Sequence, residues 1–329
     1  MSKKFNNRNL LIILVVLAGI FVVARMTKFK SANQTLNTDI VAIDTSKVSA
    51  IHLFPASEKG EEVRISKKGD LWTVSKGDIS APADPTAVEY ALNDLLNLKT
   101  EQLVARSEEK WADYHVNDSL GTRVMIKEGK KTTLDLVIGR FDYKPTQNPY
   151  GGGYGGYGQN QGTGITYVRS SESDEVYAVE SFLSMTFNRG FSSWRNQTVT
   201  SFTPSQVNRI VFDYPADSGF FAQRSDNVWM VGGLQADSAS MASYLNSASR
   251  QRASAFKDDF ATSALPDYQV TFEGESMQPV SVKAFTQPDG GYVMHSSLNP
   301  ESWFNVQDDR LFRDLFKSVE ELTSINNNQ

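Results

Sequence analysis

Short runs of alternating or β-branched apolar residues begin at residue 48 and predict a series of antiparallel strands. The first run covers residues 48–54, the second centres on Val63 and Ile65, and the third covers residues 71–74 after a Lys-Gly-Asp turn. A tight turn between two such runs is typical of a β-hairpin. Further strands are predicted at residues 123–127, 134–138, 166–169 and 175–179.

A helix is predicted after the first hairpin, because the apolar positions there change to helical spacing. Asp84 is a good N-cap, and Pro85 suits the first helical position. The apolar stripe consists of Val88, Ala91, Leu92, Leu95 and Leu96. We expect this stripe to pack on the neighbouring sheet, so we interpret Asp84 as a helix cap rather than a catalytic acid.

The same succession of features recurs later in the chain. Between Ala83 and Asn93 the offset to the second copy is 153 residues, and at an Asp-Tyr-x-Val motif it is 154. A period this long indicates a duplicated domain-sized unit, because solenoid repeats run at about 20–50 residues. The matched segments are Trp72 with Trp229, Ala83-Asp84 with Ala236-Asp237, Leu92-Asn93 with Leu245-Asn246, and Asp113-Tyr114-His115-Val116 with Asp267-Tyr268-Gln269-Val270.

Hairpins grouped around one or two helices predict an α+β fold. We expect two tandem similar units of antiparallel β-hairpins packed on a helix, preceded by one N-terminal transmembrane helix. Each unit closes with a short amphipathic segment, at residues 182–187 and 311–316. The predicted parts are a membrane anchor (1–30), a tether (31–47), a first repeat (48–200) with a Gly/Tyr-rich insertion (150–164), a second repeat (201–323) and a disordered tail (324–329).

Residues 10–24 form an apolar run that includes Gly19. As a helix the run would rise about 22 Å, and its flanking residues extend it toward the roughly 30 Å hydrocarbon core. We therefore expect an uncleaved signal anchor that contacts the lipid bilayer. A cleaved signal peptide is the alternative, although no small-x-small cleavage site follows the run. Because a large body follows a signal-like segment, we expect a single-pass inner (cytoplasmic) membrane protein with its body on the extracytoplasmic side.

Charge is unevenly distributed. Residues 1–30 contain six Lys or Arg and no acidic residue, while the whole chain has a net charge of −5, so residues 31–329 are strongly acidic. An acidic body argues against nucleic acid as a partner, because phosphate binding needs a basic surface. The chain has no cysteine, which excludes disulfides, thiolate metal sites and cysteine nucleophiles.

The candidate chemistry is sparse. Residues 150–164 read YGGGYGGYGQNQGTG, a composition that does not build a packed core. The simplest interpretation is a floppy insertion. The functional alternative is a recognition loop in which Tyr150, Tyr154 and Tyr157 stack on a sugar, peptidoglycan or protein partner.

The three histidines lack metal-ligand spacing. We interpret the pairs Asp258-Asp259 and Asp308-Asp309 as solvated turns rather than acid/base pairs. We therefore expect no catalytic residues, cofactor or metal.

A more specific resemblance emerges from several motifs taken together: the hairpin Trp72, the Ala83-Asp84 cap, Leu136-Val137-Ile138-Gly139, Tyr167-Val168, Val176-Tyr177-Ala178-Val179, and Phe191-Ser192-Ser193-Trp194-Arg195-Asn196. The chain thereby resembles domain-of-unknown-function family 4340 over roughly residues 45–320. The resemblance implies a bacterial protein with one N-terminal membrane helix, often encoded beside gliding-motility-type auxiliary ABC transporter components. The family has no assigned activity, so it implies no catalytic residue. The second copy departs from the pattern, with a shorter Trp-to-Asp loop and no Val-Ile-Gly turn.

Two functions are consistent with these features. The first is a non-catalytic accessory or interaction subunit of an ABC-type transport or gliding-motility-like envelope system, whose partners would be permease or auxiliary subunits. The second is an envelope glycan- or peptide-binding module that uses the Gly/Tyr loop or the groove between repeats. An enzyme is the third and least favoured class.

Overall fold

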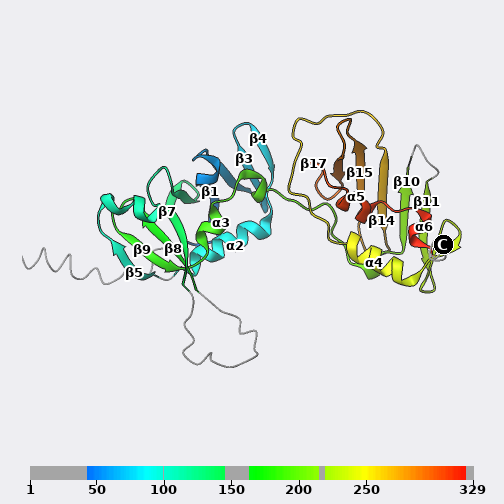
Figure 1. Cartoon of the computed structure of the whole chain (residues 1–329), viewed down its shortest axis with the longest axis horizontal. Helices are drawn as coiled ribbons and strands as arrows, with labels where there is room; N and C mark the ends of the chain where they lie inside the picture. The colour runs from blue at the N-terminus through cyan, green and yellow to red at the C-terminus, as the bar shows by residue number, and fades with distance from the viewer. Residues whose placement is uncertain (1–42, 99, 145–162, 215–218, 324–329) are drawn as a thin grey trace, which may run out of the picture.

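The computed structural model describes residues 43–98, 100–144, 163–214 and 219–323, which form two lobes joined by an extended segment (Figure 1). Each lobe is built on one antiparallel sheet with a few helices, so the predicted α+β class is confirmed. The predicted anchor, most of the tether and the predicted tail lie outside the described residues. Within the described ranges, no helix is long and apolar enough to cross a membrane.

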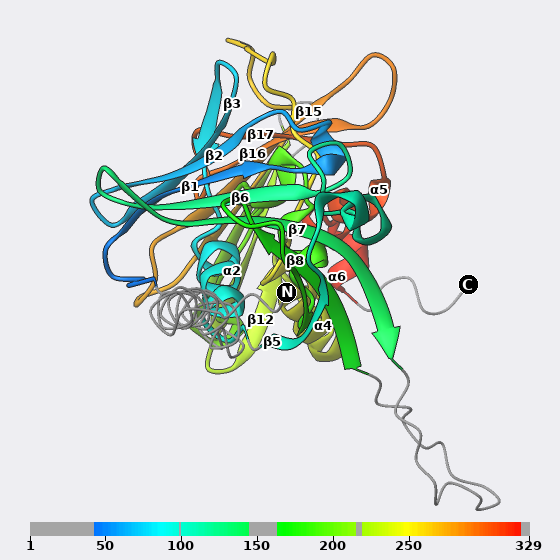
Figure 2. The ribbon, with the colours of Figure 1, turned by 90° about the vertical axis from the view of Figure 1, so that its left-hand side faces the viewer.

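The first sheet has nine strands in the order β4-β3-β2-β1-β6-β7-β8-β9-β5. Two helices, α2 (Pro85–Leu96) and α3 (Leu183–Phe187), accompany it, and Figure 2 shows α2 on one side of the strands. The strands are β1 (Val48–Phe54), β2 (Val63–Lys68), β3 (Leu71–Lys76), β4 (Ile79–Pro82), β5 (Thr100–Ala105), β6 (Thr122–Glu128), β7 (Lys131–Lys144), β8 (Thr163–Ser170) and β9 (Val176–Glu180).

The second sheet has eight strands in the order β13-β12-β11-β10-β14-β15-β16-β17, accompanied by α4 (Ser238–Ala248), α5 (Asp309–Leu315) and α6 (Val319–Leu322). Position by position, this order corresponds to the first eight strands of the first sheet, and β5 is the additional ninth. The strands are β10 (Arg209–Asp213), β11 (Phe220–Ser225), β12 (Val228–Val231), β13 (Leu234–Gln235), β14 (Tyr268–Glu273), β15 (Val280–Thr286), β16 (Tyr292–Ser296) and β17 (Trp303–Val306).

Each lobe has its own hydrophobic core between the inner face of the sheet and the capped helix. In the first lobe, Ile51 of β1 lies opposite Ile126 of β6, and both are fully buried. In the second lobe, Ile210 of β10 lies opposite Phe272 of β14 in the same way. The predicted caps form as expected: the Asp84 carboxylate accepts the backbone N–H groups of Thr86 and Ala87, and Asp237 accepts that of Ser240.

The Trp and Ala-Asp motifs of the two lobes form the same backbone hydrogen bond. The Ala83 N–H donates to the Trp72 carbonyl at 2.9 Å, and the Ala236 N–H donates to the Trp229 carbonyl at 2.9 Å. The chain thus turns from the last strand of the hairpin directly into the helix cap. Both tryptophans are partly buried against their cores. Trp194 is fully buried, whereas Trp303 is partly exposed.

The predicted pairing of the two Asp-Tyr motifs is wrong. Tyr114 lies in a 3₁₀ turn (Ala112–Tyr114) ahead of β6, whereas Tyr268 is the first residue of β14. Because β6 and β14 occupy the same place in their sheets, Tyr114 and Tyr268 are not equivalent. The first lobe has β5 and two 3₁₀ turns between α2 and β6, whereas no strand lies between α4 and β14, so a constant offset does not match the two lobes beyond the helix.

Strands β4 and β5 were not expected from the pattern. Both lie at the edges of the first sheet, where β4 ends in Pro82 and β5 contains polar residues, so neither has a clear strand signature. Strand β7 is also longer than its predicted core of 134–138. A register shift in its pairing with β8, between Ile138 and Phe141, lets the strand continue past Gly139.

A small satellite core covers the outer face of β7 and β8. The 3₁₀ turns around Trp111 and Tyr114 place Val116 against Val137 there. The buried guanidinium of Arg169 lies 3.7 Å from the centre of the Trp111 ring, and its Nε donates to the Val116 carbonyl at 3.2 Å. Burial lowers the pKa of Arg169, but the carbonyl contacts and the ring compensate for much of its lost hydration.

Candidate functional site

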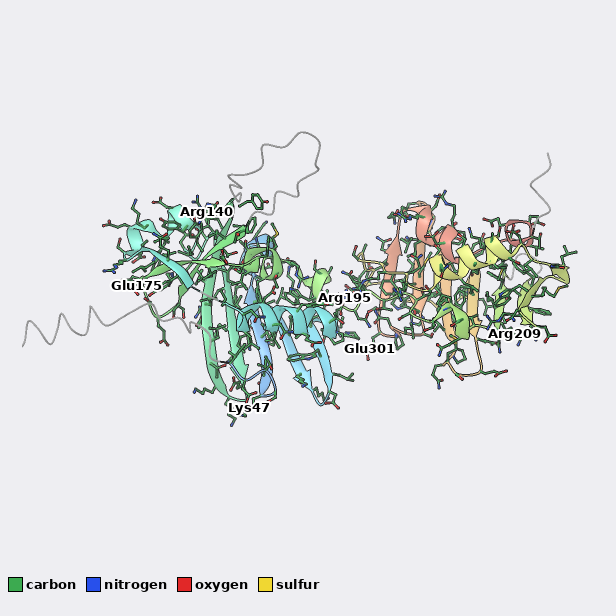
Figure 3. The ribbon with its side chains drawn as sticks, turned by 90° about the horizontal axis from the view of Figure 1, so that it is seen from below. Lys47, Arg140, Glu175, Arg195, Arg209 and Glu301 are labelled. Carbon is green, nitrogen blue, oxygen red and sulfur yellow. The ribbon has the colours of Figure 1, made fainter. Side chains whose placement is uncertain are left out.

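The seam between the lobes is organised around Arg195. This residue lies on the connecting segment and is 1% exposed (Figure 3). Its two terminal nitrogens each donate to one oxygen of Asp258, which follows α4, at 2.8 Å. The guanidinium also lies 3.6 Å from the centre of the Phe256 ring. A planar guanidinium suits this combination of bidentate pairing and ring stacking.

Further contacts fix the same seam. Asp84, the cap of α2, uses its other oxygen to bind Arg252 of the second lobe at 2.7 Å. The side-chain amide of Asn299 donates to the Asn196 carbonyl at 2.6 Å. The seam therefore joins the connecting segment and the cap of α2 to the second lobe. At these points the protein's own side chains occupy the groove between repeats, which the sequence suggested as one of two binding surfaces.

Asp258 and Asp259 lie in an exposed turn, as predicted, but Asp258 has an additional role. Its side chain is 35% exposed and is the counter-ion of a guanidinium that is almost fully buried. A buried charge needs such a partner. Asp308 has a different role, since it caps α5 through the Arg310 N–H.

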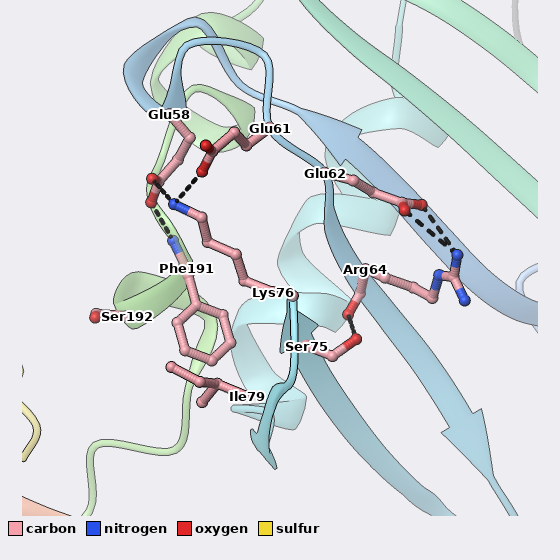
Figure 4. A pocket seen from close by; sticks show the side chains of 10 residues that line it. Glu58, Glu61, Glu62, Arg64, Ser75, Lys76, Ile79, Phe191 and Ser192 are labelled. Atoms are coloured by element: carbon pink, nitrogen blue, oxygen red, sulfur yellow. Dashed lines mark hydrogen bonds and ion pairs between the residues drawn. The ribbon is translucent and has the colours of Figure 1, made fainter. Parts of the chain in front are cut away.

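A charged groove of about 870 Å³ lies beside the β3–β4 hairpin (Figure 4). Lys76 binds Glu58 at 2.5 Å and Glu61 at 2.9 Å, and Glu58 also accepts the backbone N–H of Phe191 at 2.9 Å. Across the groove, Glu62 pairs with Arg64 and with His52. The ionised groups satisfy one another, so the arrangement ties the η1 turn (Ala56–Glu58) and β3 to the segment that leads to the seam.

The charged groove predicts an acid-dependent loss of stability. The ammonium of Lys76, and then the Phe191 N–H, hold the pKa of Glu58 below its usual 4.5. A lowered folded pKa contributes stability above pH 4.5, which is lost as the pH falls through the folded value. We expect the urea midpoint to fall between pH 6 and pH 3.5, and to fall less in Glu58→Gln. Equal falls in both proteins would contradict this role. Glu301→Gln, an exposed change in the second lobe, is the control.

An aromatic groove of about 360 Å³ opens on the second lobe between the sheet and the segment joining α5 to α6. Five rings line it, from Tyr214, Phe220, Tyr268, Phe312 and Phe316. The Tyr214 and Tyr268 ring centres are 5.2 Å apart, and those of Tyr268 and Phe312 are 4.9 Å apart. Edge-to-face contacts of this kind hold the rings in place.

One phenol of the aromatic groove is fixed by the backbone. The Tyr214 hydroxyl donates to the Lys317 carbonyl at 2.9 Å, and burial raises the pKa of Tyr214 well above its usual value. Four of the five rings remain partly exposed, all but Phe316. The groove therefore offers a preformed aromatic surface whose shape does not depend on a ligand to organise it.

The sequence-predicted recognition residues Tyr150, Tyr154 and Tyr157 lie outside the described residues. The strands that flank them are described. Thr163 and Gly164, which fall within the predicted insertion 150–164, are instead the first residues of β8. The three histidines do not converge: His52 pairs with Glu62, His115 ends a 3₁₀ turn, and His295 packs on Trp303. In the described part of the chain, no group of His, Cys, Asp and Glu is arranged to hold a metal ion.

Sequence reasoning missed both the buried Arg195 and the aromatic groove. Arg195 has no local signal of burial, because its ion-pair partner Asp258 is 63 residues away. A signal for the groove existed in the i, i+4 pair Phe312 and Phe316, whose ring centres lie 4.8 Å apart at the end of α5.

Comparison with known proteins gives one result. The family model "Domain of unknown function (DUF4340)" matches residues 72–271, which is more than half of the chain and runs from β3 of the first lobe to β14 of the second. No curated protein and no solved structure matches the chain.

Proposed function

The chain belongs to the DUF4340 family of domains of unknown function, and from that premise we propose that it is a non-catalytic interaction protein, anchored in the membrane by residues 10–24. Its body lies on the extracytoplasmic side and acts as an accessory subunit of an ABC-type transport or gliding-motility-like system. The two lobes derive from an internal duplication, which the matching strand orders and the repeated Trp-to-Ala junction support.

The aromatic groove carries this proposal. Partly exposed aromatic rings in a recess are well suited to anchor a protein partner, because a ring buries a large apolar area at little cost in conformational entropy. The Arg195–Asp258 and Asp84–Arg252 pairs also connect the lobe that carries the groove to the connecting segment and to the first lobe. A partner bound in the groove would thereby be linked to the first lobe.

Site-specific photo-crosslinking in cells tests the proposal. A photo-reactive residue in place of Val319, which lines the groove, should crosslink to a permease or another transporter subunit. The control is the same residue in place of Leu265, which is 80% exposed and does not line the groove. If position 319 gives no transporter adduct while the protein is expressed in the membrane, or if both positions give the same adducts, the proposal is wrong.

A second candidate is an envelope glycan- or peptide-binding module. The same rings favour it, because sugar faces and peptide side chains stack on exposed Tyr and Phe. Binding of glycan or peptide fragments that is unchanged when Phe220 is replaced by Ser would remove the groove from consideration for this function.

A further inference from the structure

Lysines gather at one end of the first sheet. The turn between β2 and β3 and the turn between β6 and β7 lie next to each other there, because Val48 at the start of β1 pairs with Glu128, and Ala50 pairs with Ser66 near the end of β2. We call this end the lysine rim. Its cations are Lys47, Lys67, Lys68, Lys127, Lys130 and Lys131, against three carboxylates, Asp44, Asp70 and Glu128.

The chain enters the sheet at the lysine rim. Residue 43 is the first that the structure describes, and the predicted anchor precedes it. The Asp44 N–H donates to Glu128 at 2.8 Å, and the Asp44 carboxylate binds Lys47 at 2.7 Å. These contacts fasten the incoming chain to the β6–β7 turn, so the end of the sheet that carries the lysines is also the end joined to the anchor.

An exposed leucine lies within the rim. Leu71 is the first residue of β3, pairs across the turn with Lys68, and is 74% exposed. An apolar side chain beside several lysines is the composition of surfaces that rest on lipid, where cations meet anionic headgroups and the apolar group enters the interface. Such a surface is unexpected on an otherwise acidic body.

The second lobe provides an internal comparison. At the corresponding end of its sheet, the β11–β12 turn reads Arg224-Ser225-Asp226-Asn227-Val228, and the β14–β15 turn begins Glu273-Gly274-Glu275. These turns contain no lysine and more acids than bases. The fold is shared, so the lysines are a property of the lobe nearest the anchor rather than a requirement of the architecture.

We infer that the lysine rim rests on the membrane surface and binds anionic lipid headgroups, with Leu71 in contact with the lipid interface. The inference rests on the proposed membrane anchoring and adds an orientation to it. Strands β7 and β8 meet residues 145–162 at the opposite end of the sheet from the rim, and Figure 3 shows Lys47 and Arg140 at these two ends. The attachment points of the Gly/Tyr segment therefore lie away from the membrane, on the side accessible to partners.

Single-cysteine labelling of the full-length chain tests the inference, because the chain has no native cysteine. Leu71→Cys and its counterpart Val228→Cys, each carrying an environment-sensitive fluorophore, are compared in vesicles of phosphatidylcholine alone and with added phosphatidylglycerol. We expect a blue shift and quenching by brominated lipid at position 71 only, stronger with the anionic lipid. Replacing Lys67, Lys68, Lys130 and Lys131 by Ser should lower the equilibrium constant for contact between the lysine rim and the anionic lipid surface. The expected decrease is up to about fivefold per lysine at low salt.

The experiment tests the membrane anchor and the lipid contact of the lysine rim separately. If an alkaline wash removes the protein from the vesicles, the anchor is refuted. In that case the label at position 71 still shows whether the rim binds anionic vesicles. The rim does not rest on the membrane if the protein stays in the vesicles but the labels at positions 71 and 228 respond alike. The same conclusion follows if the fluorescence at position 71 is unchanged by lipid charge and by the lysine substitutions. High salt should abolish the lipid-charge dependence, since the Debye length falls to about 3 Å at 1 M.

Discussion

Replacing Arg195 by Ala should destabilise the protein by about 3 kcal/mol, because it removes one partner of a largely buried ion pair. The change leaves the Asp258 carboxylate without its bidentate donor and opens a void beside Phe256. We take the lower end of the usual range, since Asp258 is partly exposed and water can compensate for some of the loss. Denaturant unfolding, followed by tryptophan fluorescence, gives the change in the free energy of unfolding.

The neighbouring pair supplies the control. Arg252 also binds across the seam, but its side chain is 54% exposed. Arg252→Ala should therefore cost no more than about 1 kcal/mol, as exposed ion pairs do. If the two substitutions cost the same, the burial of Arg195 does not determine its contribution. Arg195→Ala should also separate the unfolding of the lobes into two transitions, whereas a purely local defect would leave the number of transitions unchanged.

Replacing Gly139 by Ala should cost about 3 kcal/mol, at the upper end of what overpacking usually causes. A Cβ at this position would lie 2.1 Å from the Tyr114 carbonyl oxygen and 2.7 Å from a methyl of Val116. The first of these neighbours is backbone, so the turn that carries Tyr114 would have to move away from β7. The satellite core around Val116 and Val137 would loosen with it. Chemical denaturation and amide exchange in residues 111–116 measure the two effects.

Gly69 distinguishes steric conflict from the general cost of replacing glycine. It lies in the β2–β3 turn with φ +63°, and an added Cβ would meet nothing within 4 Å. Gly69→Ala should cost only about 1 kcal/mol, from the left-handed backbone conformation. A Gly139→Ala variant no less stable than Gly69→Ala would show that the close approach of β7 to Tyr114 is not required.

Much of the fold could be predicted from local pattern. The β-branched and aromatic content of residues 48–54, the Asp84 and Asp237 caps and the apolar stripe of α2 each depend on neighbouring residues, so the sequence displays them directly. The edge strands β4 and β5 could not be predicted in this way, because their pairing comes from strands already placed by the core. The false equivalence of Tyr114 and Tyr268 has a related cause, since a four-residue match carries no information on which secondary-structure element contains it.

The candidate binding surfaces depended still more on tertiary structure. The aromatic groove brings Tyr214 and Phe220 to Phe312 and Phe316, almost a hundred residues later in the chain. No periodicity links these positions, because they come from strands and helices whose contact is set by packing. The lysine rim is similar, since its two turns are sixty residues apart and become neighbours only through the pairing of β1 with both β2 and β6.

The sequence by itself determined the α+β class, the two capped helices, most of the strands and the family, because propensity, capping and hydrophobic alternation act over a few residues. The tertiary structure alone decided that Arg195 is buried and that Asp258 is its counter-ion. It also decided that aromatic rings from the beginning and the end of the second lobe's sequence form one groove. These properties come from contacts between distant segments. Burial and charge pairing are set by what the whole fold places around a side chain, and no local pattern encodes them.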